Sequence, residues 1–322
     1  MKEKVFGGYI NDIEKLKKCA SGGLATAMME KAIGMGTVVY GVAYAGDFKS
    51  AEYIRADHKD VIEKLRSSKY IKAKLNPEIL SKLANDLEIG KTVLFTGLPC
   101  DVNALKQYLQ KHMICTDHLL CVDLICGGPT IPEVAKQYIS GLEKKYKSKV
   151  VAFSVRYKNP YWTPPYVYAV FENGKVFKRE LYDTQYGIAF SMLAGSACYK
   201  CTHKADRYQS DITIGDYWGA TPEDACYNPY GTSIAFVHTE KGEAYLKSLD
   251  NFNLFVADYE KAVKGNPMYK VPTKFPKDGD LFRKHFVEKG LDYAVAKYLG
   301  MKRFVPMWVK RIRRTAIRKL RK

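Results

Sequence analysis

Helix signals and short apolar strands alternate along the first half of this chain, and this alternation restricts the fold more than any other feature. Thr92-Val-Leu-Phe95 is a short apolar run of the kind that forms a buried strand, and it leads directly into the turn Thr96-Gly-Leu-Pro-Cys100. Such alternation is typical of a sheet covered by helices. We expect strands at 37–44, 92–95 and 119–125, and helices at 23–34, 57–65, from 76 onward, 100–111 and 130–144.

Several of these helices have recognisable start signals. Asp57 is a suitable N-cap, and Asn76 followed by Pro77 places proline at the first helical position. Thr130 with Glu133 three residues later predicts a capping box.

The periodicity changes to about two between residues 150 and 181. Turn signals at Asn159-Pro160 and Asn173-Gly174 divide this stretch, which predicts an antiparallel section. Further short strands are expected at 211–215 and 233–237. The sequence therefore predicts the α/β fold class with some α+β content: a mixed sheet with flanking helices.

Composition and the chain start exclude several classes of protein. The chain has 322 residues, of which 47% are hydrophobic, and this is incompatible with a disordered or fibrous protein. The first residues lack the apolar segment of a signal peptide, and no apolar run approaches the roughly 18–20 residues that span a bilayer. We expect a cytoplasmic protein.

Positive charge is concentrated at the C-terminus. Residues 301–322 contain ten Lys or Arg and no Asp or Glu, so they supply +10 of the formal net charge of +18. The rest of the chain gives little support for nucleic-acid binding, and we expect no nucleic-acid partner. Residues 301–322 predict a basic amphipathic helix that either contacts an anionic membrane surface peripherally or packs on the protein body.

Four of the eight cysteines occupy positions that suit metal ligation. Cys100 and Cys126 each follow a predicted buried strand, and Cys198 and Cys201 form a Cys-x-x-Cys. Ligands collect at strand ends in open α/β sheets. Four thiolates from three loops could therefore form an S₄ site, for zinc or for an iron–sulfur cluster.

Other interpretations of the cysteines remain open. Cys100 and Cys126 could be small buried hydrophobic residues, and Cys198 with Cys201 could be a thioredoxin-like redox pair. Cys121 lies inside a strand and is predicted to be core. The remaining three, less suited to ligation, are Cys19, Cys115 and Cys226.

The segments around these cysteines resemble the coenzyme F420 hydrogenase/dehydrogenase beta-subunit family over about residues 5–240. Five groups of motifs occur in the family's order: Ser21-Gly-Gly23; Ser68-Lys-Tyr-Ile71; Phe95-Thr-Gly-Leu-Pro-Cys100; Asp123-Leu-Ile-Cys-Gly-Gly-Pro129; and Cys198-Tyr-Lys-Cys201 followed by Arg207 and Asp211-Ile-Thr-Ile-Gly-Asp-Tyr-Trp-Gly219.

The resemblance implies an iron–sulfur flavoprotein oxidoreductase. It would pass electrons between a reduced carrier (an F420-like deazaflavin, a ferredoxin or similar) and FAD through one [4Fe-4S] cluster. The implied cluster ligands are Cys100, Cys126, Cys198 and Cys201. The implied cofactor-binding residues are Ser21, Gly22, Gly23, Ser68, Lys69, Tyr70, Gly97, Arg207, Gly215 and Asp216. The domains would be a small N-terminal one at 1–90, a larger cluster- and flavin-binding one at 91–262, and a helical extension at 263–322.

The flavin residues also have simpler interpretations. Gly22 and Gly23 could offer backbone N–H groups to a phosphate at a helix N-terminus, or Ser21 could be an ordinary N-cap. Lys69 and Arg207 could neutralise phosphate or be solvated cations. Asp216 and Trp218 lie in a tight turn, which would either face the cofactors or simply bury the Trp.

Two departures from the family pattern bear on function. The sequence has no ferredoxin-like Cys-x-x-Cys-x-x-Cys segment, and Gly127-Gly128 follows Cys126 where many relatives have His. No histidine matches a motif, so we expect no protein general acid.

Partners would be a small electron carrier or a ferredoxin-like protein, with a homo-oligomer as a further expectation. The alternative is a zinc-stabilised or degenerate accessory protein of surface-polysaccharide biosynthesis without redox activity.

Overall fold

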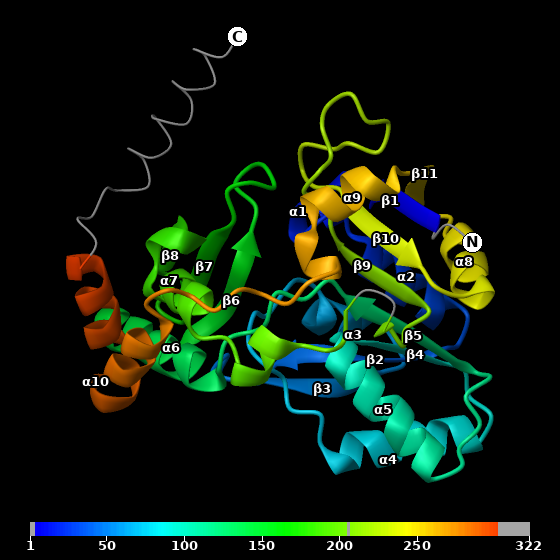
Figure 1. Ribbon diagram of the computed structural model, residues 1–322, viewed down its shortest axis with the longest axis horizontal. Helices are drawn as coiled ribbons and strands as arrows, with labels where there is room; N and C mark the ends of the chain where they lie inside the picture. Colours follow the sequence, from blue (N-terminus) through cyan, green and yellow to red (C-terminus); the bar gives the residue numbers. More distant parts are fainter. Residues whose placement is uncertain (1–3, 205–206, 302–322) are drawn as a thin grey trace.

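The computed structural model describes residues 4–204 and 207–301, which form two β-sheets with helices around them (Figure 1). The large sheet has the strand order β11-β1-β10-β9-β5-β4-β2-β3. Its strands are β1 (Lys4–Ile10), β2 (Val38–Tyr44), β3 (Ala51–Ala56), β4 (Val93–Gly97), β5 (Leu119–Leu124), β9 (Ile212–Asp216), β10 (Ser233–Val237) and β11 (Phe252–Val256). The small antiparallel sheet contains β6 (Val150–Tyr157), β7 (Tyr166–Phe171) and β8 (Val176–Glu180).

The helices cover both faces of the large sheet and one side of the small one. They are α1 (Ile13–Lys18), α2 (Leu24–Gly34), α3 (Lys59–Leu65), α4 (Pro77–Glu88), α5 (Pro99–Lys111), α6 (Pro132–Tyr146), α7 (Gln185–Met192), α8 (Glu240–Lys247), α9 (Tyr259–Gly265) and α10 (Gly279–Met301). Short 3₁₀ helices are η1 (Leu181–Asp183), η2 (Ser196–Lys200) and η4 (Pro267–Tyr269). The prediction of a mixed α/β fold is confirmed.

The centre of the large sheet is parallel, and this decides where the functional residues meet. Strands β2, β4, β5 and β9 run in the same direction, and their carboxyl ends therefore share one edge of the sheet. On one side of this centre β3 is antiparallel to β2, and on the other side β10, β1 and β11 follow in antiparallel pairs. Segments that follow β4, β5 and β9 thus leave the sheet side by side.

Alternate residues of the central strands enter two different cores. In β4, Val93 and Phe95 belong to the core under α4 and α5, whereas Leu94 faces the core under α2 and α3. Burial on both faces explains the continuous apolar runs of these strands.

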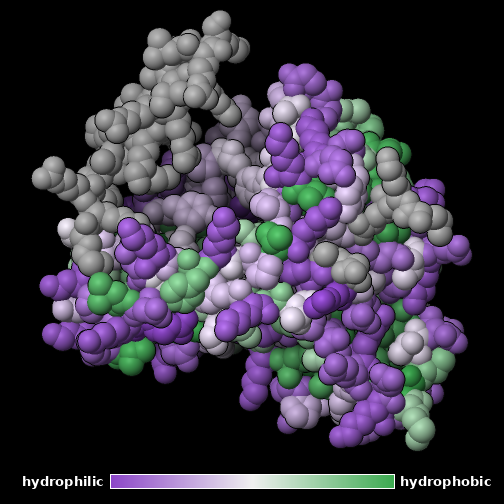
Figure 2. Space-filling view, viewed as in Figure 1, coloured by the Kyte–Doolittle hydropathy of each residue, from purple (hydrophilic) through white to green (hydrophobic). Residues whose placement is uncertain are grey.

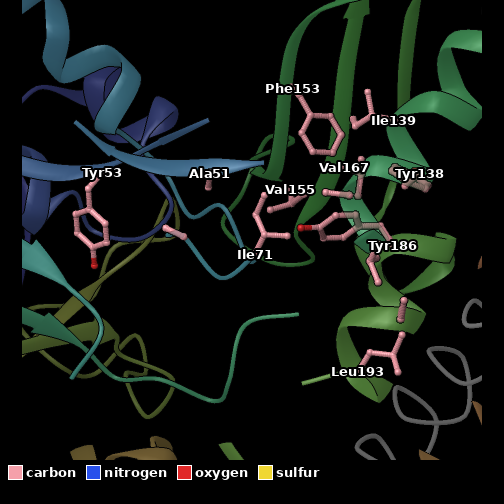
Figure 3. Packing of buried hydrophobic residues seen from close by; sticks show 14 of the residues in the cluster. Ala51, Tyr53, Ile71, Tyr138, Ile139, Phe153, Val155, Val167, Tyr186 and Leu193 are labelled. Carbon is pink, nitrogen blue, oxygen red and sulfur yellow. The ribbon is translucent and has the colours of Figure 1, made fainter. Parts of the chain in front are cut away.

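The core under α4 and α5 also joins the two sheets. Phe153, Val155 and Val167 of the small sheet pack there with Tyr186 of α7, and Ile71 lies beside the Tyr186 ring (Figure 3). The strands of the large sheet come from both of the predicted domains, 1–90 and 91–262. The domain boundaries themselves stay a prediction.

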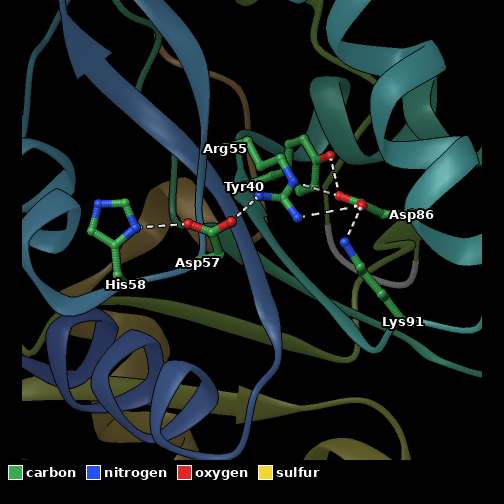
Figure 4. A network of polar contacts seen from close by, with 6 residues as sticks. All are labelled: Tyr40, Arg55, Asp57, His58, Asp86 and Lys91. Carbon is green, nitrogen blue, oxygen red and sulfur yellow. Dashed lines mark hydrogen bonds and ion pairs between the residues drawn. The ribbon is translucent and has the colours of Figure 1, made fainter.

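Two predicted caps are wrong. His58, not Asp57, is the N-cap of α3, because the Asp57 carboxylate is held by Arg55 and by Nδ1 of His58 at 2.7 Å (Figure 4). Arg55 also bonds Asp86 of α4, which fixes this helix to β3. At α6 the N-cap is Ile131 without a side-chain cap, because Thr130 donates its hydroxyl to Leu193 O instead.

Three strands of the large sheet were not predicted: β1, β3 and β11. All three lie in the antiparallel outer parts of the sheet. The strand β3 pairs with its chain neighbour β2, whereas β1 pairs with β10 and β11, which are far away in sequence.

Hydrophilic side chains cover most of the face in Figure 2, with hydrophobic residues in small separate patches. Within residues 4–204 and 207–301, no helix is long and apolar enough to cross a membrane. The predicted basic helix lies outside the described residues, apart from its first residue.

Candidate functional site

The four predicted ligand cysteines gather at the carboxyl edge of the large sheet. Cys100 is the second residue of α5, directly after β4, and Cys126 lies two residues beyond β5. Cys198 lies in η2 and Cys201 follows it as the C-cap. All four cysteine residues lie at the intermediate level between core and surface.

Backbone pairing brings these separate segments together. Thr130, four residues after Cys126, forms a parallel bridge with Ile71 and an antiparallel bridge with Ala194, four residues before Cys198. Lys72 N donates to Thr130 O, and Thr130 N donates to Tyr70 O, both at 3.0 Å. The loop after β5 is therefore held between the segment before η2 and residues 67–72, which we call the strap.

Electrostatic interactions connect the four thiols in a closed ring. Cys100 interacts with Cys126 and Cys201, and Cys198 interacts with the same two. Burial, together with the charges of Cys100 and Cys198, raises the pKa of Cys126 to about 11. Burial is also the main reason that the pKa values of Cys100 and Cys198 are raised. We call these four residues the thiol ring; a bound metal would take the place of the thiol protons.

Gly128 allows the thiol ring to close. Its φ of +91° is a left-handed conformation, and a Cβ there would lie 3.0 Å from the Cβ atoms of both Ala194 and Cys198. Its N–H donates to Cys126 Sγ at 3.3 Å. Packing therefore requires glycine at residue 128, whereas at residue 127, where many relatives have His, a Cβ would meet only Met268 Cγ at 3.8 Å.

Within the described part of the chain, no three His, Cys, Asp or Glu side chains are arranged to hold a single metal ion. Four thiolates are a usual ligand set both for iron–sulfur clusters and for structural zinc.

The other cysteines contribute nothing to this ring. Cys121 is completely buried in β5, which confirms the prediction that it belongs to the core. Cys19 and Cys226 are also buried, and Cys115 is exposed.

A second group of polar residues surrounds Arg156 of β6, at the carboxyl end of β9. The guanidinium bonds both oxygens of Asp216 at 3.0 and 3.1 Å and Ala20 O at 2.9 Å. Burial opposes its charge, but Asp216 keeps the pKa of Arg156 above its ordinary value. Lys158 donates to Leu16 O and Ser21 O, both at 2.7 Å, and burial lowers its pKa to about 7.

Aromatic side chains line the same region. The Trp218 ring lies 5.4 Å from the Arg156 guanidinium and stacks on Trp162 at 4.7 Å. Trp218 is 47% exposed while Trp162 is buried, so part of the supported indole is accessible to a ligand. Tyr70 interacts electrostatically with Arg156 and stacks on Phe190 at 4.5 Å. We call Arg156, Lys158, Asp216, Tyr70 and Trp218 the arginine cluster.

Of the predicted flavin residues, Ser21, Tyr70 and Asp216 contact the arginine cluster or belong to it. Ser21 is not the N-cap of α2: Gly23 is, with φ +84°, and the Ser21 hydroxyl donates to Thr232 O at 2.8 Å. Gly22 permits close packing, because a Cβ there would lie 2.3 Å from Gly8 O.

The remaining predicted flavin residues have structural partners or lie at the surface. Lys69 is buried and donates to Leu65 O, Arg66 O and Ser67 O, so it closes the end of α3. Gly97 and Gly215 make room for Tyr53 and Ile125 respectively. Ser68 is partly buried in the strap, and Arg207 is exposed.

Sequence reasoning missed Arg156 and Lys158. One signal was present: the two cations are two residues apart, on the same face of a strand, in Val155-Arg-Tyr-Lys158. Their connection with Ala20 and Ser21 spans more than 130 residues and could not be read from this pattern.

The strap connects the two groups of residues. Tyr70 lies beside Arg156, and Lys72, two residues further, donates to Cys100 Sγ at 3.6 Å. The chain is thus an α/β protein in which one short segment contacts both a ring of thiols and a buried, aromatic-lined ion pair.

Comparison with known proteins agrees with this description. A model of the family described as the C terminus of the beta subunit of coenzyme F420 hydrogenase/dehydrogenase matches residues 90–260, more than half of the chain. The chain therefore belongs to this family, whose name relates it to subunits of oxidoreductases.

The fold is similar to a solved chain of the F420-reducing [NiFe] hydrogenase complex from Methanosarcina barkeri, determined in a xenon derivatization study. The TM-score is 0.57 and the sequence identity 18%, over 88% of this chain and 92% of that chain. Among curated proteins, none matches the chain.

Proposed function

We propose that this chain is an iron–sulfur flavoprotein that passes electrons between a reduced carrier and FAD through one [4Fe-4S] cluster. The carrier would be an F420-like deazaflavin, a ferredoxin or a similar molecule. The observation that carries the proposal is that one short segment, the strap, contacts both groups: Tyr70 interacts with Arg156 of the arginine cluster, and Lys72 contacts Cys100 of the thiol ring. Two redox groups held there would be separated by a short stretch of packed protein.

The family favours a cluster over zinc as the group held by the thiol ring, because its name relates it to subunits of oxidoreductases. A structural zinc ion bound by four thiolates, at Zn–S distances of about 2.3 Å, is the alternative. Cys100, Cys126, Cys198 and Cys201 would be the cluster ligands.

When bound, FAD would supply exchange between two-electron and single-electron transfer, and the cluster would supply a single-electron relay. The chain's own residues would bind and orient these groups. The Arg156 Nε is buried without a hydrogen-bond partner among the described residues, so the guanidinium can still bind an acceptor. The exposed part of Trp218 offers an aromatic surface to a planar ring, and Trp162 fixes its orientation.

A groove beside the thiol ring suggests where a protein partner would dock. It has a volume of about 610 Å³ and lies between η2 and residues 272–275. Tyr199 and Phe275 line it with Lys200 and Lys274. Aromatic and basic side chains next to Cys198 and Cys201 favour an acidic electron-transfer protein.

The first test is a spectrum of anaerobically purified protein, with iron, sulfide, zinc and released flavin assayed on the same sample. We expect about four iron and four sulfide per chain, loss of both in Cys198→Ala, and retention in the matched control Cys115→Ala. Bound FAD should fall in Trp218→Ala and persist in Trp218→Phe. A colourless protein with one zinc would refute the proposal.

A further inference from the structure

The Lys72 ammonium contacts both Cys100, a predicted cluster ligand, and the buried carboxylate of Asp101. Its nitrogen is 3.6 Å from Cys100 Sγ and forms an ion pair with Asp101 Oδ1. The Asp101 side chain is only 7% exposed, whereas that of Lys72 is 41% exposed.

The Asp101 carboxylate is fixed in position. The Tyr53 hydroxyl donates to its second oxygen at 2.8 Å, and Asp101 lies in the first turn of α5 beside Cys100. Tyr53 itself stacks on Phe95 at 5.3 Å. The negative charge beside Cys100 therefore cannot move away, and Lys72 is the cation that compensates it.

We infer that Lys72 is a positioning residue that sets the electrostatic environment of Cys100 and thereby the reduction potential of the group held by the thiol ring. This inference rests on the proposed function. A cluster becomes more negative when it accepts an electron, so a nearby ammonium favours the reduced state and a nearby carboxylate disfavours it. Lys72 and Asp101 consequently shift the reduction potential in opposite directions.

A matched control for Lys72 lies nearby in the chain. Lys74 is two residues further along and is exposed. Removing its charge changes the net charge by the same amount without removing a contact to Cys100. A change at Lys72 that Lys74 does not reproduce is therefore local.

The experiment is a potentiometric titration, followed by electron paramagnetic resonance, of the full chain loaded with iron and sulfide. Lys72→Met should shift the midpoint to a lower potential, and Asp101→Asn should shift it to a higher one. The double variant should return toward the unmodified protein. Lys72→Arg, which keeps the charge, and Lys74→Met should both stay near the unmodified value.

The outcomes separate this inference from the proposed function. Shifts of opposite sign in the two single variants support it. Midpoints that do not move, shifts of the same sign, or loss of iron from both single variants would show a purely structural role and overturn it. If the unmodified chain binds no iron and sulfide, the proposed function fails, and this inference fails with it.

Discussion

At the thiol ring, burial raises the pKa values of Cys100, Cys126 and Cys198 and disfavours charge, whereas in the arginine cluster two opposite charges are already paired. The first group is held by backbone bridges through Thr130, and the second by side chains that reach carbonyls far away in sequence. The difference predicts that the thiol ring gains stability from a bound group, whereas the arginine cluster is organised by the chain itself.

Removal of metal should have the largest effect on stability, and it should affect the thiol ring but not the arginine cluster. Metal–thiolate binding can contribute roughly 10 kcal/mol to folding in small proteins. After iron is removed with a chelator, residues 196–204 should become sensitive to protease while the segment around Arg156 stays protected. Mass spectrometry of the fragments identifies the sites. Equal exposure of both segments would contradict the comparison.

Arg156→Met should destabilise the arginine cluster. It leaves the Asp216 carboxylate without its guanidinium, and the free energy of unfolding should fall by roughly 3 kcal/mol. Arg179→Met, at an exposed position of β8, is the control and should change it by less than about 0.5 kcal/mol. Urea unfolding measures both. Equal decreases in the free energy of unfolding for the two variants would show that the buried Arg156–Asp216 ion pair makes no special contribution to stability.

Gly128→Ala tests whether the thiol ring needs its left-handed residue. The new Cβ would crowd Ala194 and Cys198, and the strained backbone should cost about 1–3 kcal/mol and reduce the iron content. Gly141→Ala in α6 has open space around the new Cβ and should instead stabilise the protein by about 0.5–1 kcal/mol. Thermal unfolding and iron assays distinguish the two variants.

The pH dependence of stability should report on Lys158. Burial lowers its pKa in the folded protein to about 7 from the ordinary 10.5, so above pH 7 the unfolded chain binds more protons. Stability should therefore rise with pH, by about 1 kcal/mol per pH unit from this residue. Urea unfolding of the unmodified protein and Lys158→Met at pH 7, 8 and 9 measures the difference in slope. Parallel pH profiles would indicate an ordinary pKa.

The central part of the fold could be predicted from the sequence because its signals are local. Strands such as β4 are buried on both faces and appear as apolar runs, and Asn76 with Pro77 starts α4 as expected. The outer strand β10 was also predicted, because all its residues are buried, whereas β11 is mostly half-buried and lacks such a continuous apolar pattern. That β1 pairs with these two strands could not be predicted, since the pairing joins residues more than 220 positions apart in the chain. Asp57 and Thr130 failed as caps because tertiary partners took their side chains.

The residues alone were enough to predict the α/β class, the family, and the strand ends at which Cys100 and Cys126 lie. Strand patterns and cysteine motifs are formed by residues that are neighbours in the sequence. The pairing of Arg156 with Asp216, the bridging of two segments by Thr130 and the contact of Lys72 with Cys100 became visible only in the folded chain. These contacts join residues that are distant in sequence. Their geometry follows from how the two sheets pack together, which no local pattern encodes.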